Sequence, residues 1–194
     1  MGKSSIEILT DFAKRNNYQY WDEILPEKSI LPHRGKLINT KHFVLKYPTE
    51  TYTYYFCASD KGANATYSGL YGNYSKYKTP ELTISPRYWI DRFIIKQRKK
   101  SGISALDKKI SISCSNEKLV KAVVDPKLGD EFVQLSKKLT PIELVIENND
   151  LKYNTEMGSE SIIGIRTNRW ITEENELKLL LDQGSKLLNM VRKK

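Results

Sequence analysis

The residue types that most often carry catalysis or bind metals are scarce in this 194-residue chain. It has two histidines, His33 and His42, and two cysteines, Cys57 and Cys114. The histidine spacing matches neither an HExxH pair nor another metal-ligand pattern, and the cysteines are too far apart for a CxxC motif. We therefore expect structural or surface histidines and buried cysteines that pack as small hydrophobic residues.

The carboxylates offer no clear acid/base pair either. Asp22 with Glu23, and Glu173 with Glu174, are adjacent in sequence and so point in different directions. The sequence also lacks P-loop, GxSxG, HExxH, GxGxxG and EF-hand patterns. We expect no cofactor, and an enzyme with an unfamiliar site is the least favoured of three functions.

Positive charge is concentrated in one segment. The chain carries a net charge of +9, and Arg87 to Lys109 contains eight Lys or Arg residues against two aspartates. Such a cluster is suited to phosphate or another anion. Its alternative role is to stabilise the C-terminal end of a helix through the helix dipole. The candidate anion contacts are Lys96, Arg98, Lys99 and Lys100.

A second segment, from Asp60 to Thr79, is rich in Gly, Asn, Ser and Tyr. Tyrosine offers a large contact area at a low cost in conformational entropy, so this composition suits a recognition loop. The favoured alternative is that the tyrosines lie across a sheet edge. The candidate partner contacts are Tyr67, Tyr71, Tyr74 and Tyr77.

The hydrophobic pattern of the first half predicts the elements that position these residues. A capped helix begins at Ser4 or Ser5 and ends at Asn16 and Asn17. The further expected elements are a short strand over 18–24, a loop marked by Pro26, Pro32 and Gly35, two or three antiparallel strands over 36–59, a strand over 82–84, and a helix over 86–100.

The second half has a clearer pattern. Alternation predicts a strand over 110–114, and helical spacing predicts helices over 116–124 and 126–139. A hairpin is expected over 142–153, with its turn at 148–150. A further strand near 162–165 and a last helix from Thr172 complete the expectation.

Together these elements predict an α+β fold, with antiparallel sheet packed against about five helices. We expect two lobes in one compact body: a Tyr-rich β lobe over 1–85 and an αβ lobe over 86–194, or alternatively one domain. No apolar run approaches the roughly 20 residues of a membrane helix. The first residues run directly into a charged amphipathic pattern, which favours a cytoplasmic protein.

The strand over 110–114, the two helices after it and the 142–153 hairpin resemble the carboxyl module of an uncharacterised bacterial family classed as a domain of unknown function. The opening helix with Phe12 and Ala13 is also similar to the start of several such proteins. The resemblance implies a fold but no activity, and it transfers no catalytic residue to this chain.

The favoured function is a non-enzymatic interaction protein that contacts an unknown protein partner through its tyrosine-rich segment. The alternative is nucleic-acid binding, because the elements from 86 to 153 follow the order of a winged helix, with 126–139 as the recognition helix. Asp130, Glu131 and Asp150 would repel phosphates there. The basic 87–109 segment is therefore the better phosphate contact.

Overall fold

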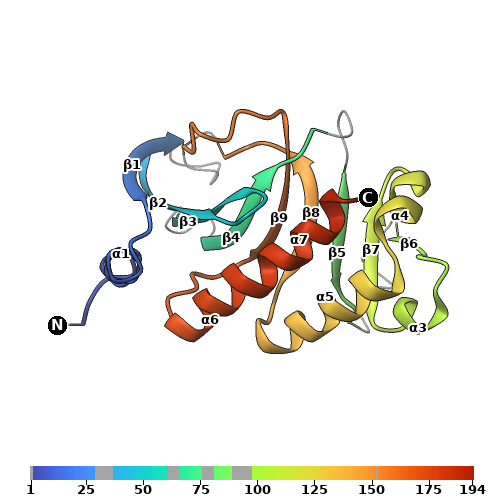
Figure 1. Ribbon diagram of the computed structural model, residues 1–194. Coiled ribbons are helices and arrows are strands. Elements are labelled where there is room, and N and C mark those ends of the chain that lie inside the picture. The colour runs from blue at the N-terminus through green and yellow to red at the C-terminus, as the bar shows by residue number, and fades with distance from the viewer. Residues whose placement is uncertain (1, 29–36, 61–65, 76–80, 89–97, 152) are drawn as a thin grey trace.

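The computed structural model describes residues 2–28, 37–60, 66–75, 81–88, 98–151 and 153–194. Its centre is a nine-stranded sheet in the order β1-β2-β3-β4-β9-β8-β5-β7-β6. Every neighbouring pair is antiparallel. Helices cover one side of this sheet (Figure 1). The predicted α+β class is confirmed.

The strands are β1 (Tyr20–Lys28), β2 (Leu37–Pro48), β3 (Thr53–Asp60), β4 (Thr66–Asn73), β5 (Leu82–Pro86), β6 (Arg98–Lys99), β7 (Ile110–Cys114), β8 (Glu143–Asn148) and β9 (Ser161–Thr167). The helices are α1 (Ser5–Arg15), α3 (Ser104–Asp107), α4 (Glu117–Val123), α5 (Pro126–Lys138), α6 (Glu174–Leu179) and α7 (Ser185–Arg192). A π-helical turn, η1 (Leu180–Gly184), joins α6 to α7.

Local signals set the first elements. Ser4 and Glu7 form a reciprocal capping box at the start of α1, and Asn17 adopts a φ of 55° just beyond its end, as asparagine tolerates. The expected loop at Pro26 is wrong, because β1 continues through this residue. Since β1 is an edge strand, the missing amide of proline removes no bond that the sheet requires. Pro32, His33 and Gly35 lie outside the described residues.

The interpretation of 60–79 as a loop is wrong at its centre, and the favoured alternative of a sheet edge is wrong for Tyr67 and Tyr71. Residues Thr66–Asn73 form β4, an interior strand paired with β3 on one side and β9 on the other. The Gly and Tyr content suggested a loop. One partner of β4 is the preceding strand β3, but the other, β9, lies far away in sequence and leaves no local signal.

The expected helix over 86–100 is wrong at both ends. Pro86 ends β5, and the pairing with β7 continues because the Arg87 amide donates to the Lys109 carbonyl at 2.8 Å. Arg98 and Lys99 form the short edge strand β6. The residues between 89 and 97 lie outside the described ranges.

The expected 142–153 hairpin is also wrong. β8 pairs with β9 and with β5, and Leu151 and Tyr153 are not in a strand. Asn149 turns the chain out of β8. Its side-chain nitrogen Nδ2 donates to the backbone carbonyls of Met157 and Ser159 at 2.8 and 3.1 Å. The described residues of 149–160, here called the cover loop, then fold over the sheet instead of pairing with β8.

Alternation along the strands gives the sheet two different faces. On each strand, every second side chain packs under the helices in the larger core, which includes Phe56, Leu144 and Ile165. The next residue on each strand points to the opposite face, where a smaller cluster includes Tyr71, Val145 and Ile162. In Figure 1, α5, α6 and α7 lie along one side of the strands, and we call the opposite side the open face.

The sheet is continuous from β1 to β6, so it crosses the expected boundary at residue 85; the division into two lobes stays a prediction. The expected strands near 82–84, 110–114 and 162–165 and the helices near 116–124 and 126–139 are confirmed. Among the described residues, no helix combines the length and apolar character needed to cross a membrane.

Candidate functional site

The floor of the candidate site is the ring of Tyr71 on β4. This side chain is 2% exposed, and its ring lies where a Cβ atom on Gly69 or Gly164 would be. Tyr71 and Gly164 are direct cross-strand partners. Two glycines on neighbouring strands therefore let a large ring lie flat against the open face, and burial raises the pKa of the Tyr71 hydroxyl well above its usual value.

Arg166 on β9 stands beside this floor. Its Nε donates to Glu143 at 2.9 Å, and its Nη1 donates to both oxygens of Glu147 at 2.8 and 3.1 Å. Glu143 is directly opposite Arg166 in the ladder, whereas Glu147 lies further along β8, opposite Ile162. One guanidinium thus bridges two carboxylates on the same face of β8.

Burial and ion pairing act in opposite directions on the pKa values of this cluster. Burial raises the pKa of Glu147 above its usual value, although Arg166 acts in the opposite direction. Burial also acts to lower the pKa of Arg166, but Glu147 and Glu143 outweigh it and the pKa is raised. The ion pair is only partly shielded from water, because the side chain of Arg166 is 36% exposed.

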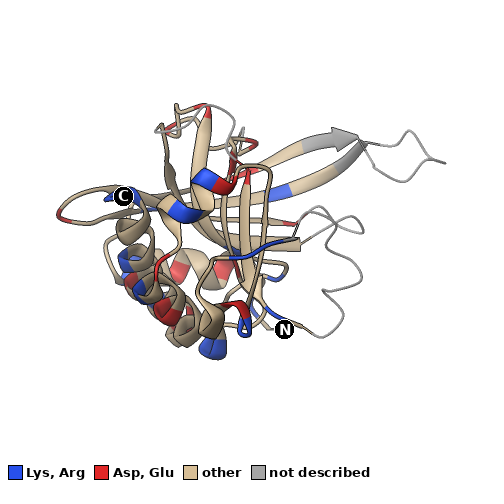
Figure 2. Cartoon of the chain, turned by 90° about the vertical axis from the view of Figure 1, so that its right-hand side faces the viewer, with Lys and Arg blue, Asp and Glu red and all other residues tan. Residues whose placement is uncertain are grey.

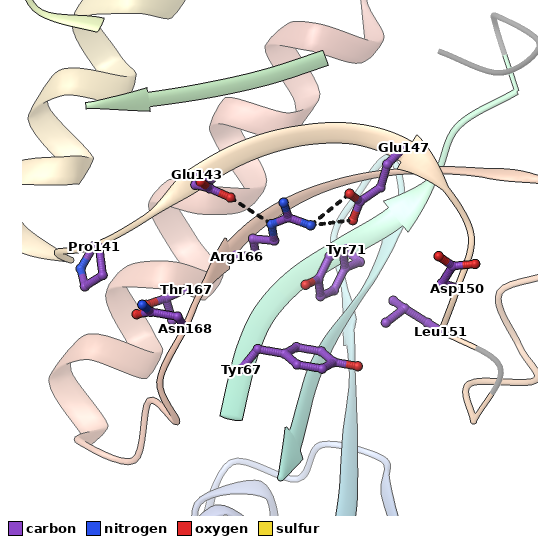
Figure 3. Close-up of a pocket in the computed structure, with 10 residues that line it drawn as sticks. All are labelled: Tyr67, Tyr71, Pro141, Glu143, Glu147, Asp150, Leu151, Arg166, Thr167 and Asn168. Atoms are coloured by element: carbon purple, nitrogen blue, oxygen red, sulfur yellow. Dashed lines mark hydrogen bonds and ion pairs between the residues drawn. The ribbon is translucent and has the colours of Figure 1, made fainter. Parts of the chain in front are cut away.

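These groups line a cavity of about 450 Å³, here called the acidic groove (Figure 3). Among the described lining residues, three carboxylates and one guanidinium carry charge, which gives this set a net negative charge. Pro141, Thr167 and Asn168 lie at one end, while Asp150 and Leu151 lie at the other. The lining residues are Tyr67, Tyr71, Pro141, Glu143, Glu147, Asp150, Leu151, Arg166, Thr167 and Asn168.

The cover loop forms one wall of the acidic groove. Its position is set by the buried side chains Leu151, Tyr153 and Met157, which pack on the open face. The hydroxyl groups of Tyr153 and Tyr67 are 3.2 Å apart. The amide of Leu151 donates to Asn149 Oδ1 at 3.1 Å, which fixes the turn that carries Asp150.

The acidic groove continues across β8 into a second, smaller hollow of about 260 Å³. Glu147 and Asp150 line both cavities. The second hollow adds Glu81 and the hydroxyl side chains of Thr83 and Ser113. Acidic and polar groups therefore extend over several neighbouring strands of the open face.

The predicted tyrosines are in different places. Tyr67 and Tyr71 both line the acidic groove. Tyr74 is 4% exposed and belongs to the helix-covered core. Tyr77 lies outside the described residues. Tertiary structure therefore brings two of the four together and separates them from the third.

The predicted basic residues are also divided. Lys99 forms an ion pair with Glu117 at 3.3 Å. Lys100 lines a different hollow from the acidic groove. Arg98 lies in β6, and Lys96 is outside the part of the chain that the structure describes.

The histidine and the cysteines have the structural roles that their spacing suggests. His42 Nδ1 lies 2.9 Å from Ser59 Oγ, but the two residues are 1% and 0% exposed, which leaves a substrate no access. Both cysteines are free and buried. Burial raises the pKa of Cys57 to about 12, so its thiol is not a nucleophile at neutral pH. Within the described ranges, no three His, Cys, Asp or Glu side chains form a metal site.

Sequence reasoning missed Arg166 and the acidic residues of the groove as site residues. One signal was present: Glu143 and Glu147 are separated by an even number of positions in an otherwise apolar strand, so they share a face. Nothing local connects them to Arg166, because the pairing of β8 with β9 spans the whole cover loop.

No family model matches the chain, and neither a curated protein nor a solved structure matches it. The resemblance to an uncharacterised bacterial family stays a prediction. The function must therefore be argued from the geometry of the site.

Proposed function

We propose that the protein is a non-enzymatic binding protein whose acidic groove takes a lysine or arginine side chain of a protein partner. One observation carries the proposal: the groove is lined by three carboxylates and one guanidinium, although the whole chain has a net charge of +9. A local reversal of charge selects a cationic ligand and orients it on approach.

The size and lining of the groove support a single side chain as the inserted group. Its volume of about 450 Å³ is within the usual range for small ligands, and too small for a whole protein interface. Tyr67 and Tyr71 provide aromatic surface beside the carboxylates. Cations are attracted both to carboxylates and to the faces of aromatic rings.

Two of the three carboxylates, Glu143 and Glu147, are held in place by Arg166 before a ligand arrives. Arg166 fixes Glu143 through one oxygen, Oε2. Asp150 is exposed at the end of the groove, and within the described part of the chain it has no hydrogen bond or ion pair. A cation can therefore approach Asp150 without breaking the bridge between Arg166 and the two glutamates.

The test is an NMR titration of the full chain with two blocked pentapeptides, one with a central arginine and one with a central glutamate, each flanked by glycines. We expect saturable shifts at Tyr67, Asp150 and Arg166 with the arginine peptide alone, and weaker binding as salt rises. A lysine peptide tests whether the site distinguishes the two cations.

The variant Asp150→Asn should weaken binding of the arginine peptide about fivefold or more, because one charge of the site is lost. The matched control is Glu131→Gln on α5, which removes an exposed carboxylate away from the groove and should change affinity less than about twofold. Equal binding of the arginine and glutamate peptides, or equal effects of the two variants, would contradict the proposal.

A further inference from the structure

The basic segment does not act as one cluster in three dimensions. Lys99 is paired with Glu117 at 3.3 Å, and Lys109 lies 3.7 Å from Asp130. Along the helices too, Lys and Arg are mixed with Asp and Glu (Figure 2). The positive charge of the segment is therefore partly neutralised by carboxylates from α4 and α5.

Three other cations of this segment line a hollow of about 540 Å³, here called the basic hollow. They are Arg87, Lys100 and Lys108, and all three are exposed. None has a carboxylate partner among the described residues. The other described residues of the lining are Gly102, Ser104 and Asp107.

The turn over 101–107, which lies between Lys100 and Lys108, is held by its own hydrogen bonds. The carboxylate oxygen Oδ1 of Asp107 accepts from the amide and the hydroxyl of Ser101, both at 2.8 Å. The Ser101 hydroxyl oxygen in turn accepts from the amide of Ile103 at 3.0 Å. The carboxylate of Asp107 is thus already engaged in hydrogen bonds within the turn.

Arg87 is anchored to the same turn from the neighbouring strand. Its Nη1 donates to the carbonyl of Asp107 at 2.7 Å, and its amide donates to the carbonyl of Lys109. Because these acceptors are neutral carbonyls, the guanidinium is positioned without losing its charge. Arg87 therefore keeps donors that can bind an anion.

We propose that the basic hollow binds a phosphate group. Three cations converge there against one carboxylate that is already hydrogen-bonded, and Arg and Lys are the usual side chains for phosphate oxygens. The hollow of about 540 Å³ has room for more than a single phosphate, so a phosphate that belongs to a larger molecule also fits. Its source is a free phosphorylated compound or the backbone of a nucleic acid.

The first experiment is calorimetric titration of the full chain with pyrophosphate at low salt. We expect saturable binding with one site, which Lys100→Gln and Lys108→Gln each weaken about fivefold or more. The matched controls are Lys99→Gln and Lys109→Gln, which remove cations already paired with carboxylates. These should change affinity less than about twofold. Absence of saturable binding, or equal effects of the two pairs of variants, overturns the proposal.

A second titration with a 12-base-pair DNA duplex distinguishes the two sources. If the phosphate belongs to nucleic acid, the duplex binds more tightly than pyrophosphate, and three phosphate contacts give a slope of about −3 in log affinity against log salt. If it belongs to a free compound, pyrophosphate binds at least as tightly as the duplex. Lys108→Gln should weaken both ligands.

The test of the basic hollow is independent of the test of the acidic groove. Asp150→Asn should leave pyrophosphate affinity within about twofold of the unmodified protein, and Lys108→Gln should leave binding of the arginine peptide equally unchanged. Either site can therefore fail its test without affecting the other.

Discussion

The two faces of the sheet use the same strands for different purposes. The helix-covered face presents Phe56, Leu144 and Ile165 to a continuous apolar core. The open face has a smaller apolar cluster under the cover loop, and next to it the charged groups of the acidic groove. Because successive residues alternate between the faces, one strand such as β8 supplies both core and charge. The comparison indicates that apolar packing is concentrated on the covered face, whereas the open face also carries exposed charge.

The largest expected effect tests the covered face. Phe132 on α5 is 1% exposed in the larger core, so Phe132→Ala should lower the free energy of unfolding by about 3–5 kcal/mol through lost burial and a cavity. Tyr67→Ala on the open face, where the side chain is only partly buried, should cost about 1–2 kcal/mol. Urea denaturation of both variants measures the difference. Similar losses would remove the distinction between the faces.

The next effect tests the close packing of the open face. Gly164→Ala should destabilise the protein by about 1–3 kcal/mol, because the new methyl group meets the buried Tyr71 ring. Gly158→Ala in the cover loop is the control, since a Cβ atom there contacts nothing within 4 Å. If the ring is the cause, the double variant Gly164→Ala/Tyr71→Leu should lose less than the sum of the single losses. Thermal denaturation of the unmodified protein, the single variants Gly164→Ala, Gly158→Ala and Tyr71→Leu, and the double variant gives the comparison.

A smaller effect concerns the cap of a covering helix. Asp125 accepts a hydrogen bond from the Leu128 amide at 2.7 Å at the start of α5, and Asp125→Ala should cost about 1 kcal/mol. This hydrogen bond, together with Lys194, lowers the pKa of Asp125 below its usual value of 3.8. Its contribution is therefore present above pH 3.8 and is lost as pH falls through the lowered pKa. A loss that stays constant down to pH 2, by urea denaturation, would contradict this assignment.

The smallest effect has the opposite dependence on pH and belongs to the open face. Burial raises the pKa of Glu147 above its usual value of 4.5. The protonated side chain therefore contributes to the free energy of unfolding below pH 4.5, and this contribution is lost as pH rises through the raised pKa. The stability of the unmodified protein relative to Glu147→Gln should therefore fall between about pH 4 and pH 7, by less than about 1 kcal/mol. Urea denaturation at both pH values checks the sign, and a rise would mean that the Arg166 bridge outweighs burial.

Local patterns predicted much of the covered side correctly. The capping signals of α1 and the Asp125–Pro126 start of α5 were readable because the groups that satisfy a helix end lie within a few residues of it. The period of the apolar residues in β7 and β9 also predicted strands. Two of the errors involve a distant partner. β4, which pairs with β9 as well as with β3, was expected as a loop, and β8, which pairs with β5 and β9, was given the wrong neighbour.

The sequence by itself determined the α+β class, the starts of the main helices and the lack of a familiar catalytic pattern, since composition, spacing and capping are local properties of the chain. Only the tertiary structure decided that Tyr67 and Tyr71 join Arg166, Glu143 and Glu147 in one groove, and that Lys100 shares a hollow with Arg87 and Lys108. The physical reason is that strand pairing is non-local. A pleat fixes which residues of one strand share a face, but the neighbouring strand supplies the opposite charge, and its register depends on the packing of the whole sheet.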